Sequence, residues 1–106
     1  MTDEERKAIE LQAIRHNGQT AQIDITIEEL SELTKELCKF KRGYNNCDHI
    51  AEECADVLIC MEQLAIMLCI EDAQVERHMD AKLQRLAYKM QKRASKGSGI
   101  TACEMG

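Results

Sequence analysis

The segment from residue 57 to residue 67 is apolar on nearly every side when it is wound as a helix. Such a helix has to be surrounded by protein, because none of its faces suits water. The chain contains no proline and only 3% aromatic residues. Its frequent Ala, Leu, Met, Glu, Lys and Gln residues favour helix over strand. We therefore expect an all-α fold in which other helices enclose this segment.

Capping signals divide the first part of the chain into helices. The first helix is predicted over residues 3–15, and it ends at the C-cap signal of residues 16–18. A short loop is expected over residues 19–24. Thr26, with Glu29 three residues later, then forms a capping box that opens the second helix.

Two further helices follow the second one, which we expect to end near residue 41. Residues 42–46 are turn-like, and Asp48 caps a third helix that runs to about residue 68. Asp72 caps a fourth helix, whose apolar residues recur every three or four positions. These residues are Val75, Met79, Leu83, Leu86 and Met90.

The length of 106 residues fits one domain. We expect a single helical domain over residues 1–94, and a disordered C-terminal tail over residues 95–106, where the periodicity is lost. Three companion helices from so small a chain do not cover the apolar segment. We therefore predict a four-helix bundle that is completed by self-association.

Charge and hydropathy exclude several classes of protein. The formal net charge of -5 argues against nucleic-acid binding through a basic surface. The densest apolar stretch is interrupted by Glu62 and Gln63, and it falls short of the ~18 residues of a membrane span. The N-terminal residues lack the apolar stretch of a signal peptide. We predict a cytoplasmic protein with neither nucleic-acid nor membrane partners.

Six cysteines are present, but no CxxC pair occurs. Their spacings do not match a zinc site, and several fall among core positions of the predicted helices. We interpret them as reduced, small apolar residues of a cytoplasmic protein.

Two pairs of acidic residues carry the strongest chemical signal. Glu29 with Glu32, and Glu53 with Asp56, are each three residues apart, so each pair projects from one face of a helix. Like charges in this arrangement cost a few tenths of a kcal/mol per pair. Binding of a divalent cation would explain the arrangement. The alternative is that acids near helix N-termini only complement the helix dipole.

The donor types favour a hard ion. Carboxylates without a convergent histidine or thiolate suit Mg²⁺ or Mn²⁺ better than zinc or copper. A di-iron bundle would carry Glu-x-x-His, but the position three after Glu53 is Asp56, and His49 with Glu52 has the reverse order.

The order of the two acidic motifs resembles a known family. Glu-Glu-x-x-Glu at residues 28–32, followed by Glu-x-x-Asp at residues 53–56, is similar to the MazG-like all-α nucleoside triphosphate pyrophosphohydrolases, in particular the small, phage-associated members. The resemblance covers roughly residues 8–93. It implies a MazG-like bundle, a homodimer or dimer of dimers, and Mg²⁺-dependent hydrolysis of a (d)NTP to the (d)NMP and pyrophosphate.

The resemblance also implies roles for individual residues. The four matched acids Glu29, Glu32, Glu53 and Asp56 are the candidate metal ligands and catalytic residues. Glu28 lies about 100° away from Glu29 on the helix, so it is a helper or a structural acid. Lys82 and Arg85 match a basic pair that can meet substrate phosphates, although a solvated helix face explains them equally well. Cys60 and Leu64 continue the face of Asp56, either as the floor of a cleft or as core.

Two alternatives for the function remain open at this point. One is the phosphoribosyl-ATP pyrophosphohydrolase type of enzyme within the same superfamily. The other is a non-catalytic helical interaction module, whose acids only cap helices.

Overall fold

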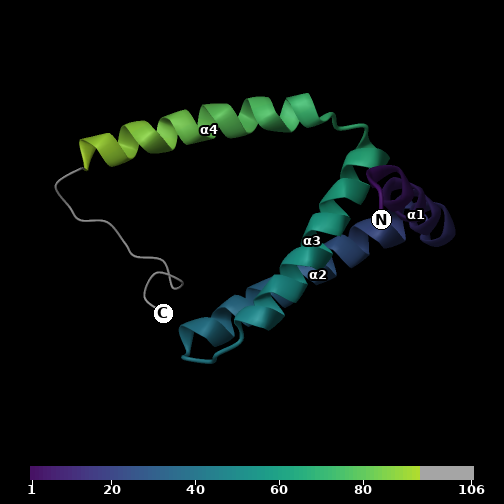
Figure 1. The fold of residues 1–106 in the computed structure, drawn as a ribbon, viewed down its shortest axis with the longest axis horizontal. Helices are drawn as coiled ribbons and strands as arrows, with labels where there is room; N and C mark the ends of the chain where they lie inside the picture. The colour runs from purple at the N-terminus through teal and green to yellow at the C-terminus, as the bar shows by residue number, and fades with distance from the viewer. Residues whose placement is uncertain (94–106) are drawn as a thin grey trace. The chain divides into compact units, whose positions relative to one another are not determined.

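The computed structural model describes residues 1–93, which form four α-helices and their short connections (Figure 1). The helices are α1 (Asp3–Asn17), α2 (Gln19–Lys41), α3 (Cys47–Leu68) and α4 (Asp72–Lys92). No strand occurs among the residues described, so the all-α prediction is confirmed. The predicted tail over residues 95–106 lies outside the described part. Contacts divide the chain into a first unit, Met1–Ile70, and a second unit that begins at Glu71.

The junction between α1 and α2 corrects a prediction. α1 begins where expected, with Thr2 accepting a hydrogen bond from the Glu5 amide, but α2 begins directly after Gly18. The predicted loop over residues 19–24 and the capping box at Thr26 are wrong. Gly18 adopts a φ of 87°, and its N–H bonds to the Ile14 carbonyl, so this single residue ends one helix and starts the next. Thr26 instead lies inside α2, where its hydroxyl donates to the Gln22 carbonyl.

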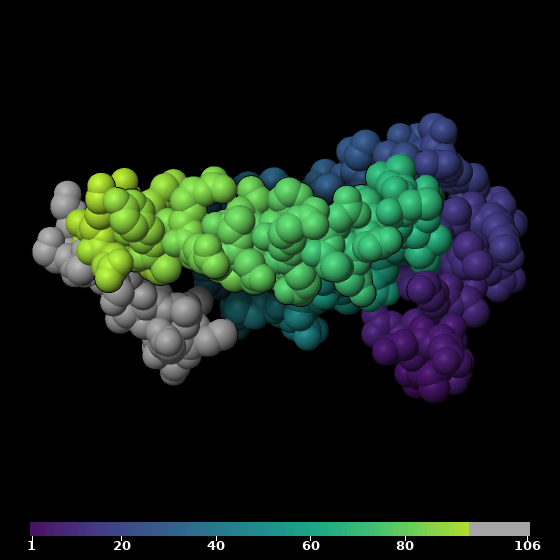
Figure 2. Space-filling view, turned by 90° about the horizontal axis from the view of Figure 1, so that it is seen from above, coloured from purple at the N-terminus to yellow at the C-terminus, as the bar shows by residue number. Residues whose placement is uncertain are grey.

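Helices α2 and α3 form an antiparallel hairpin, and their contact is the most extensive between two helices of the first unit (Figure 1). The turn at residues 42–46 joins them, and Asn46 precedes α3 as its N-cap, not the predicted Asp48. The Asn46 amide donates to both the carbonyl and the carboxylate of Glu36, each at 2.9 Å. These bonds tie the start of α3 to the last part of α2. α1 packs against both members of the hairpin, and Figure 2 shows its surface in purple beside the blue of α2.

The interior of the first unit is largely polar. Among residues 1–93 the buried apolar side chains are Val57 and Cys60. The buried polar ones are Glu10, Gln22, Thr26, Asn46 and Gln63. Polar groups removed from water need hydrogen-bond partners. The chain supplies them at the junction of the three helices, where the Asn17 side-chain amide donates to the Gln22 side-chain oxygen Oε1 at 3.0 Å, and Gln22 Nε2 donates to Gln63 Oε1 at 2.8 Å.

Many large apolar side chains lie on the outside instead. On α3, Leu58, Ile59 and Met61 are 58%, 44% and 52% exposed, although this segment is the one expected to be enclosed. On α2, Ile27, Leu30 and Leu37 are also exposed. The α2–α3 hairpin therefore keeps polar groups between its helices and leaves apolar ones uncovered.

The second unit contains α4. Its N-cap is Glu71, one residue before the predicted Asp72, and a capping box joins Glu71 to Gln74. The predicted apolar stripe from Val75 to Met90 runs along one face and is exposed. Within residues 1–93, no helix is both long enough and apolar enough to cross a membrane.

Candidate metal centre

Three carboxylates from the α2–α3 hairpin converge. Glu29 of α2, together with Glu53 and Asp56 of α3, each offers one oxygen, and these oxygens lie within 4.8 Å of one another. All three residues are half-buried. A divalent ion holds its oxygen ligands at about 2.0–2.6 Å, so donors on opposite sides of it lie about 4–5 Å apart. The spacing therefore fits the coordination of one such ion.

The register of the hairpin explains why these residues meet. The Gln22–Gln63 hydrogen bond fixes one pair of facing positions across the two helices. Glu29 follows Gln22 by seven residues, and Asp56 precedes Gln63 by seven. Because the helices are antiparallel, equal steps from a facing pair lead to another facing pair, and seven residues are close to two full turns. The same register places Glu32 across from Glu53.

The pKa values of Glu29 and Glu53 are raised because the carboxylates lie close together and are partly buried. Burial raises the pKa of Glu29, and the negative charges of Asp56 and Glu53 raise it further. Burial is also the largest cause for Glu53, whose pKa the charges of Asp56 and Glu32 raise further. Each charge disfavours ionisation of its neighbours. The cluster is thus short of positive charge.

No positive side chain of residues 1–93 forms a salt bridge with Glu29, Glu53 or Asp56. In addition, Glu53 Oε2 is buried without a hydrogen-bond partner. An acceptor in this position costs free energy unless a cation or a donor satisfies it. Both observations fit a site for a bound cation, since residues 1–93 place no positive side chain there.

The donor set suits a hard ion. All three converging ligands are carboxylates, the type that Mg²⁺ and Mn²⁺ take. Cys60 is buried nearby, and burial above all raises the pKa of its thiol. A hydrogen bond with Thr26 lowers this pKa, and the charges of Glu29 and Asp56 raise it. The thiol therefore stays neutral, which disfavours it as a ligand for a soft metal.

Only some of the predicted site residues lie together in the structure. It brings together Glu29, Glu53 and Asp56, while Glu32 lies outside this group, half-buried, and acts on Glu53 through its charge. Glu28 is exposed, and its charge contributes to raising the pKa of Glu29. Lys82 and Arg85 are exposed residues of α4, so their role in binding phosphates stays a prediction.

Sequence reasoning missed two contributors to the site. The charge of Glu36 also raises the pKa of Glu53, and the Asn46 side-chain amide donates a hydrogen bond to the carboxylate of Glu36. The signal for Glu36 was its position four residues after Glu32, on the same helix face. The Gln22–Gln63 bond gave no local signal, because its partners lie 41 residues apart.

Comparisons of the chain with models of known protein families, with curated proteins and with solved structures found no match. The residues themselves bear on function, through the geometry of the α2–α3 hairpin and the order of its two acidic motifs.

Proposed function

We propose that this chain is a Mg²⁺-dependent nucleoside triphosphate pyrophosphohydrolase of the MazG-like type, which hydrolyses a (d)NTP to the (d)NMP and pyrophosphate. The observation that carries the proposal is the convergence of Glu29, Glu53 and Asp56 within 4.8 Å, between two helices. The buried, unpartnered oxygen of Glu53 supports it. The order of the motifs at residues 28–32 and 53–56 selects this reaction among those that use a divalent ion.

Each acid has a role in this proposal. Glu29, Glu53 and Asp56 would hold Mg²⁺, or Mn²⁺ in its place. An ion bound there would supply positive charge for the phosphoryl oxygens of the substrate. Glu32, across the hairpin from Glu53, is the spare carboxylate that orients the attacking water and accepts its proton. Glu28 is exposed, and we assign it only a helper role, as one more negative charge beside Glu29.

The reaction needs no covalent intermediate on the protein. The oxygen of water bonds to one of the two phosphorus atoms of the α–β anhydride, while the bond from that phosphorus to the bridging oxygen breaks. The proton lost by the water passes to Glu32. The half-buried position of the three ligands leaves them within reach of a solvated phosphate chain.

We further propose that the protein acts as a homodimer or a dimer of dimers in the cytoplasm. The exposed apolar residues Leu58, Ile59 and Met61 of α3 support self-association. Apolar surface of this kind marks an interaction site in a folded protein. A second copy that buries it would also enclose the segment that the sequence predicts to be surrounded.

The test of the proposed function is a panel of nucleotides. The protein is incubated with each (d)NTP and with phosphoribosyl-ATP in the presence of Mg²⁺, and the products are identified by chromatography. We expect a monophosphate and pyrophosphate from at least one (d)NTP. Release of orthophosphate alone, or no turnover of any substrate, would reject the proposal, and turnover of phosphoribosyl-ATP alone would move the chain to that type of enzyme.

A helical interaction module is the second candidate. The exposed apolar stripe of α4 favours it, since such a stripe suits a partner helix. This candidate predicts that Mg²⁺ leaves the melting temperature unchanged, whereas ligand binding to the folded state raises it.

A further inference from the structure

A second pair of acids meets between α1 and α3. Glu10 is only 7% exposed, and its Oε2 is buried without a hydrogen-bond partner. Glu62 of α3 lies beside it and accepts a hydrogen bond from the Arg6 guanidinium at 2.6 Å. Glu10 is also the one residue of α1 that is buried. The docking of α1 therefore places a carboxyl group, not an apolar side chain, at its most protected position.

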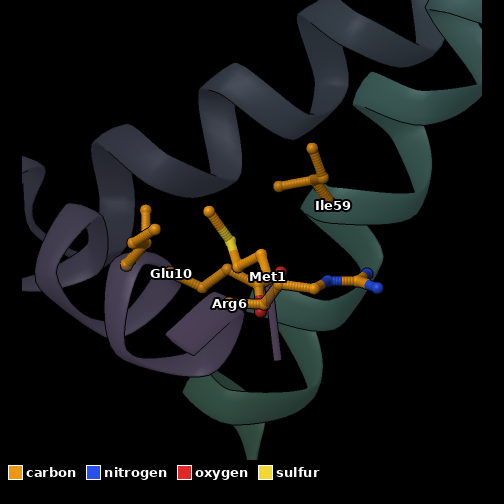
Figure 3. A pocket seen from close by; sticks show the side chains of 5 residues that line it. Met1, Arg6, Glu10 and Ile59 are labelled. Atoms are coloured by element: carbon orange, nitrogen blue, oxygen red, sulfur yellow. The ribbon is translucent and has the colours of Figure 1, made fainter. Parts of the chain in front are cut away.

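The surroundings of Glu10 are mostly apolar and stabilise an ionised carboxylate poorly. Figure 3 shows Glu10 and Arg6 on α1 at a pocket of about 220 Å³, with Ile59 of α3 on its other side. Met1 and Ile9 complete the lining, so the walls carry mostly apolar atoms. A charged carboxylate in such a place loses its hydration without equal compensation.

The charged groups that act on Glu10 come from two helices. Arg6 and Lys7 of α1 favour its ionised form, while Glu62 of α3 opposes it. Burial is the largest influence, and a hydrogen bond with Glu62 and the charge of Glu62 act in the same direction. Together they raise the pKa of Glu10 to about 7.

Two ionised carboxylates cannot hydrogen-bond to each other, because both are acceptors. Binding of one proton turns one of them into a donor. Glu62 already accepts from Arg6, so the proton belongs on Glu10, whose hydroxyl then donates to Glu62. We propose that Glu10, Glu62 and Arg6 form a proton-dependent latch that holds α1 on the α2–α3 hairpin. When the proton leaves, the negative charges of Glu10 and Glu62 repel each other across the interface, while the Arg6 guanidinium stays bonded to Glu62, and α1 loosens.

The direction of the pH effect follows from linkage. Glu10 binds its proton more tightly in the folded chain than in the unfolded one, where the pKa is about 4.5. The stabilisation by the latch is therefore complete at acidic pH, and it is lost as the pH rises through about 7. A cell whose internal pH changes near neutrality would change the mobility of α1.

Hydrogen exchange of the intact chain, read by mass spectrometry, tests the latch. We expect the protection factors of α1, corrected for the intrinsic pH dependence of exchange, to fall by about tenfold per pH unit as the pH rises from about 4.5 to about 7, and to level off above about pH 7. The α2–α3 peptides should change less. In Glu10→Gln the carboxamide keeps a donor toward Glu62 but does not titrate, so α1 protection should be independent of pH. Glu4→Gln, at an exposed position of the same helix, should behave like the natural chain.

Equal pH dependence in Glu10→Gln and in the natural chain would overturn the proposal. A second measurement avoids reliance on that variant: the carboxyl carbon of Glu10 is titrated by NMR in the natural chain. A midpoint near 7 supports the latch, and a midpoint near 4.5 contradicts it. Both measurements are independent of nucleotide turnover, so their failure would leave the proposed hydrolase activity untouched.

Discussion

Carboxyl groups crowd together at two places in the first unit, and the two places differ in what can neutralise them. Between α2 and α3, three carboxylates converge without a salt bridge from the described residues. Between α1 and α3, Glu10 meets Glu62, and Arg6 lies 2.6 Å from Glu62. One proton and one guanidinium neutralise the second pair. The first group carries too many charges for a single proton, and a divalent cation matches it better.

Access separates the two places as well. Glu29, Glu53 and Asp56 are half-buried, so an ion with its waters and a phosphate can approach them. Glu10 is almost wholly buried, so its carboxyl group is poorly placed to hold a hydrated ion together with a phosphate. Crowded acids therefore have different uses in the same small unit. Their number, nearby cations and exposure decide between binding a metal and holding a proton.

The largest expected effect is on turnover. Asp56→Asn or Glu53→Gln keeps the shape of the side chain but removes a negative ligand, and we expect the rate to fall by about a hundredfold or more. Glu4→Gln is the matched control, because Glu4 is an exposed acid of α1 and lies outside the cluster. Steady-state rates with unchanged helicity by circular dichroism provide the check. Full activity in Asp56→Asn would remove that residue from the ligand set.

Stabilisation by Mg²⁺ should be the next largest effect. A ligand at about a hundred times its Kd stabilises the folded state by about 2.7 kcal/mol. We expect a corresponding rise in Tm for the natural chain and for Glu10→Gln, but a much smaller one for Glu53→Gln. Thermal denaturation with and without Mg²⁺ measures it. If Glu10→Gln lost the response and Glu53→Gln kept it, the assignment of the two places would be reversed.

The Gln22–Gln63 bond should matter for stability and for the register of the cluster. Gln63→Leu leaves the Gln22 amide buried without its acceptor, which costs about 1–3 kcal/mol. Urea denaturation gives this value. We also expect weaker Mg²⁺ binding, because the register between α2 and α3 also determines whether Glu29 lies opposite Asp56. Unchanged Mg²⁺ affinity in a destabilised variant would show that other contacts set the register.

Stability should depend on pH through Glu10. Its raised pKa means that the folded chain holds a proton that the unfolded chain releases, so stability declines as the pH rises from about 4.5 to about 7. The contribution of Glu10 is the difference between the natural chain and Glu10→Gln, and we expect about 1–3 kcal/mol. Chemical denaturation across this pH range tests it. Parallel curves for the two chains would argue against a titrating Glu10.

The smallest effect is expected from Arg6→Gln. The Arg6–Glu62 ion pair is 47% and 43% exposed, and pairs of this kind contribute at most about 1 kcal/mol. Removal of the guanidinium also takes away a charge that lowers the pKa of Glu10. The midpoint of the Glu10 titration should therefore move to higher pH. A midpoint that moves downward would show that Arg6 does not act on this pair as described.

The sequence predicts the helices well, because their composition and apolar spacing are local properties. It fails at the start of α2, since Thr26 followed by Glu29 has the pattern of a capping box even inside a continuous helix. Residues 19–24 contain neither proline nor glycine that would break the helix. Within this segment, Gln22 bonds to Gln63 on another helix, a contact that no local pattern predicts.

In the site, too, local sequence predicts some features, whereas others depend on contacts between helices. The spacing of Glu53 and Asp56 along one helix predicts that they share a face, and the structure places them together. That Glu29 joins them while Glu32 does not depends on the register between helices, which no local pattern reveals. Glu10 gave no signal at all, because its burial arises only when α1 packs on α3.

Paramagnetic broadening by Mn²⁺ tests the central claim most directly. Substoichiometric Mn²⁺ is added to the isotopically labelled chain, and the loss of amide signals is mapped residue by residue. We predict that signals around Glu29, Glu53 and Asp56 disappear first, while those around Glu10 and Glu62 persist, and that excess Mg²⁺ restores them. Broadening centred on Glu10 and Glu62, or spread evenly over all exposed acids, would contradict the account.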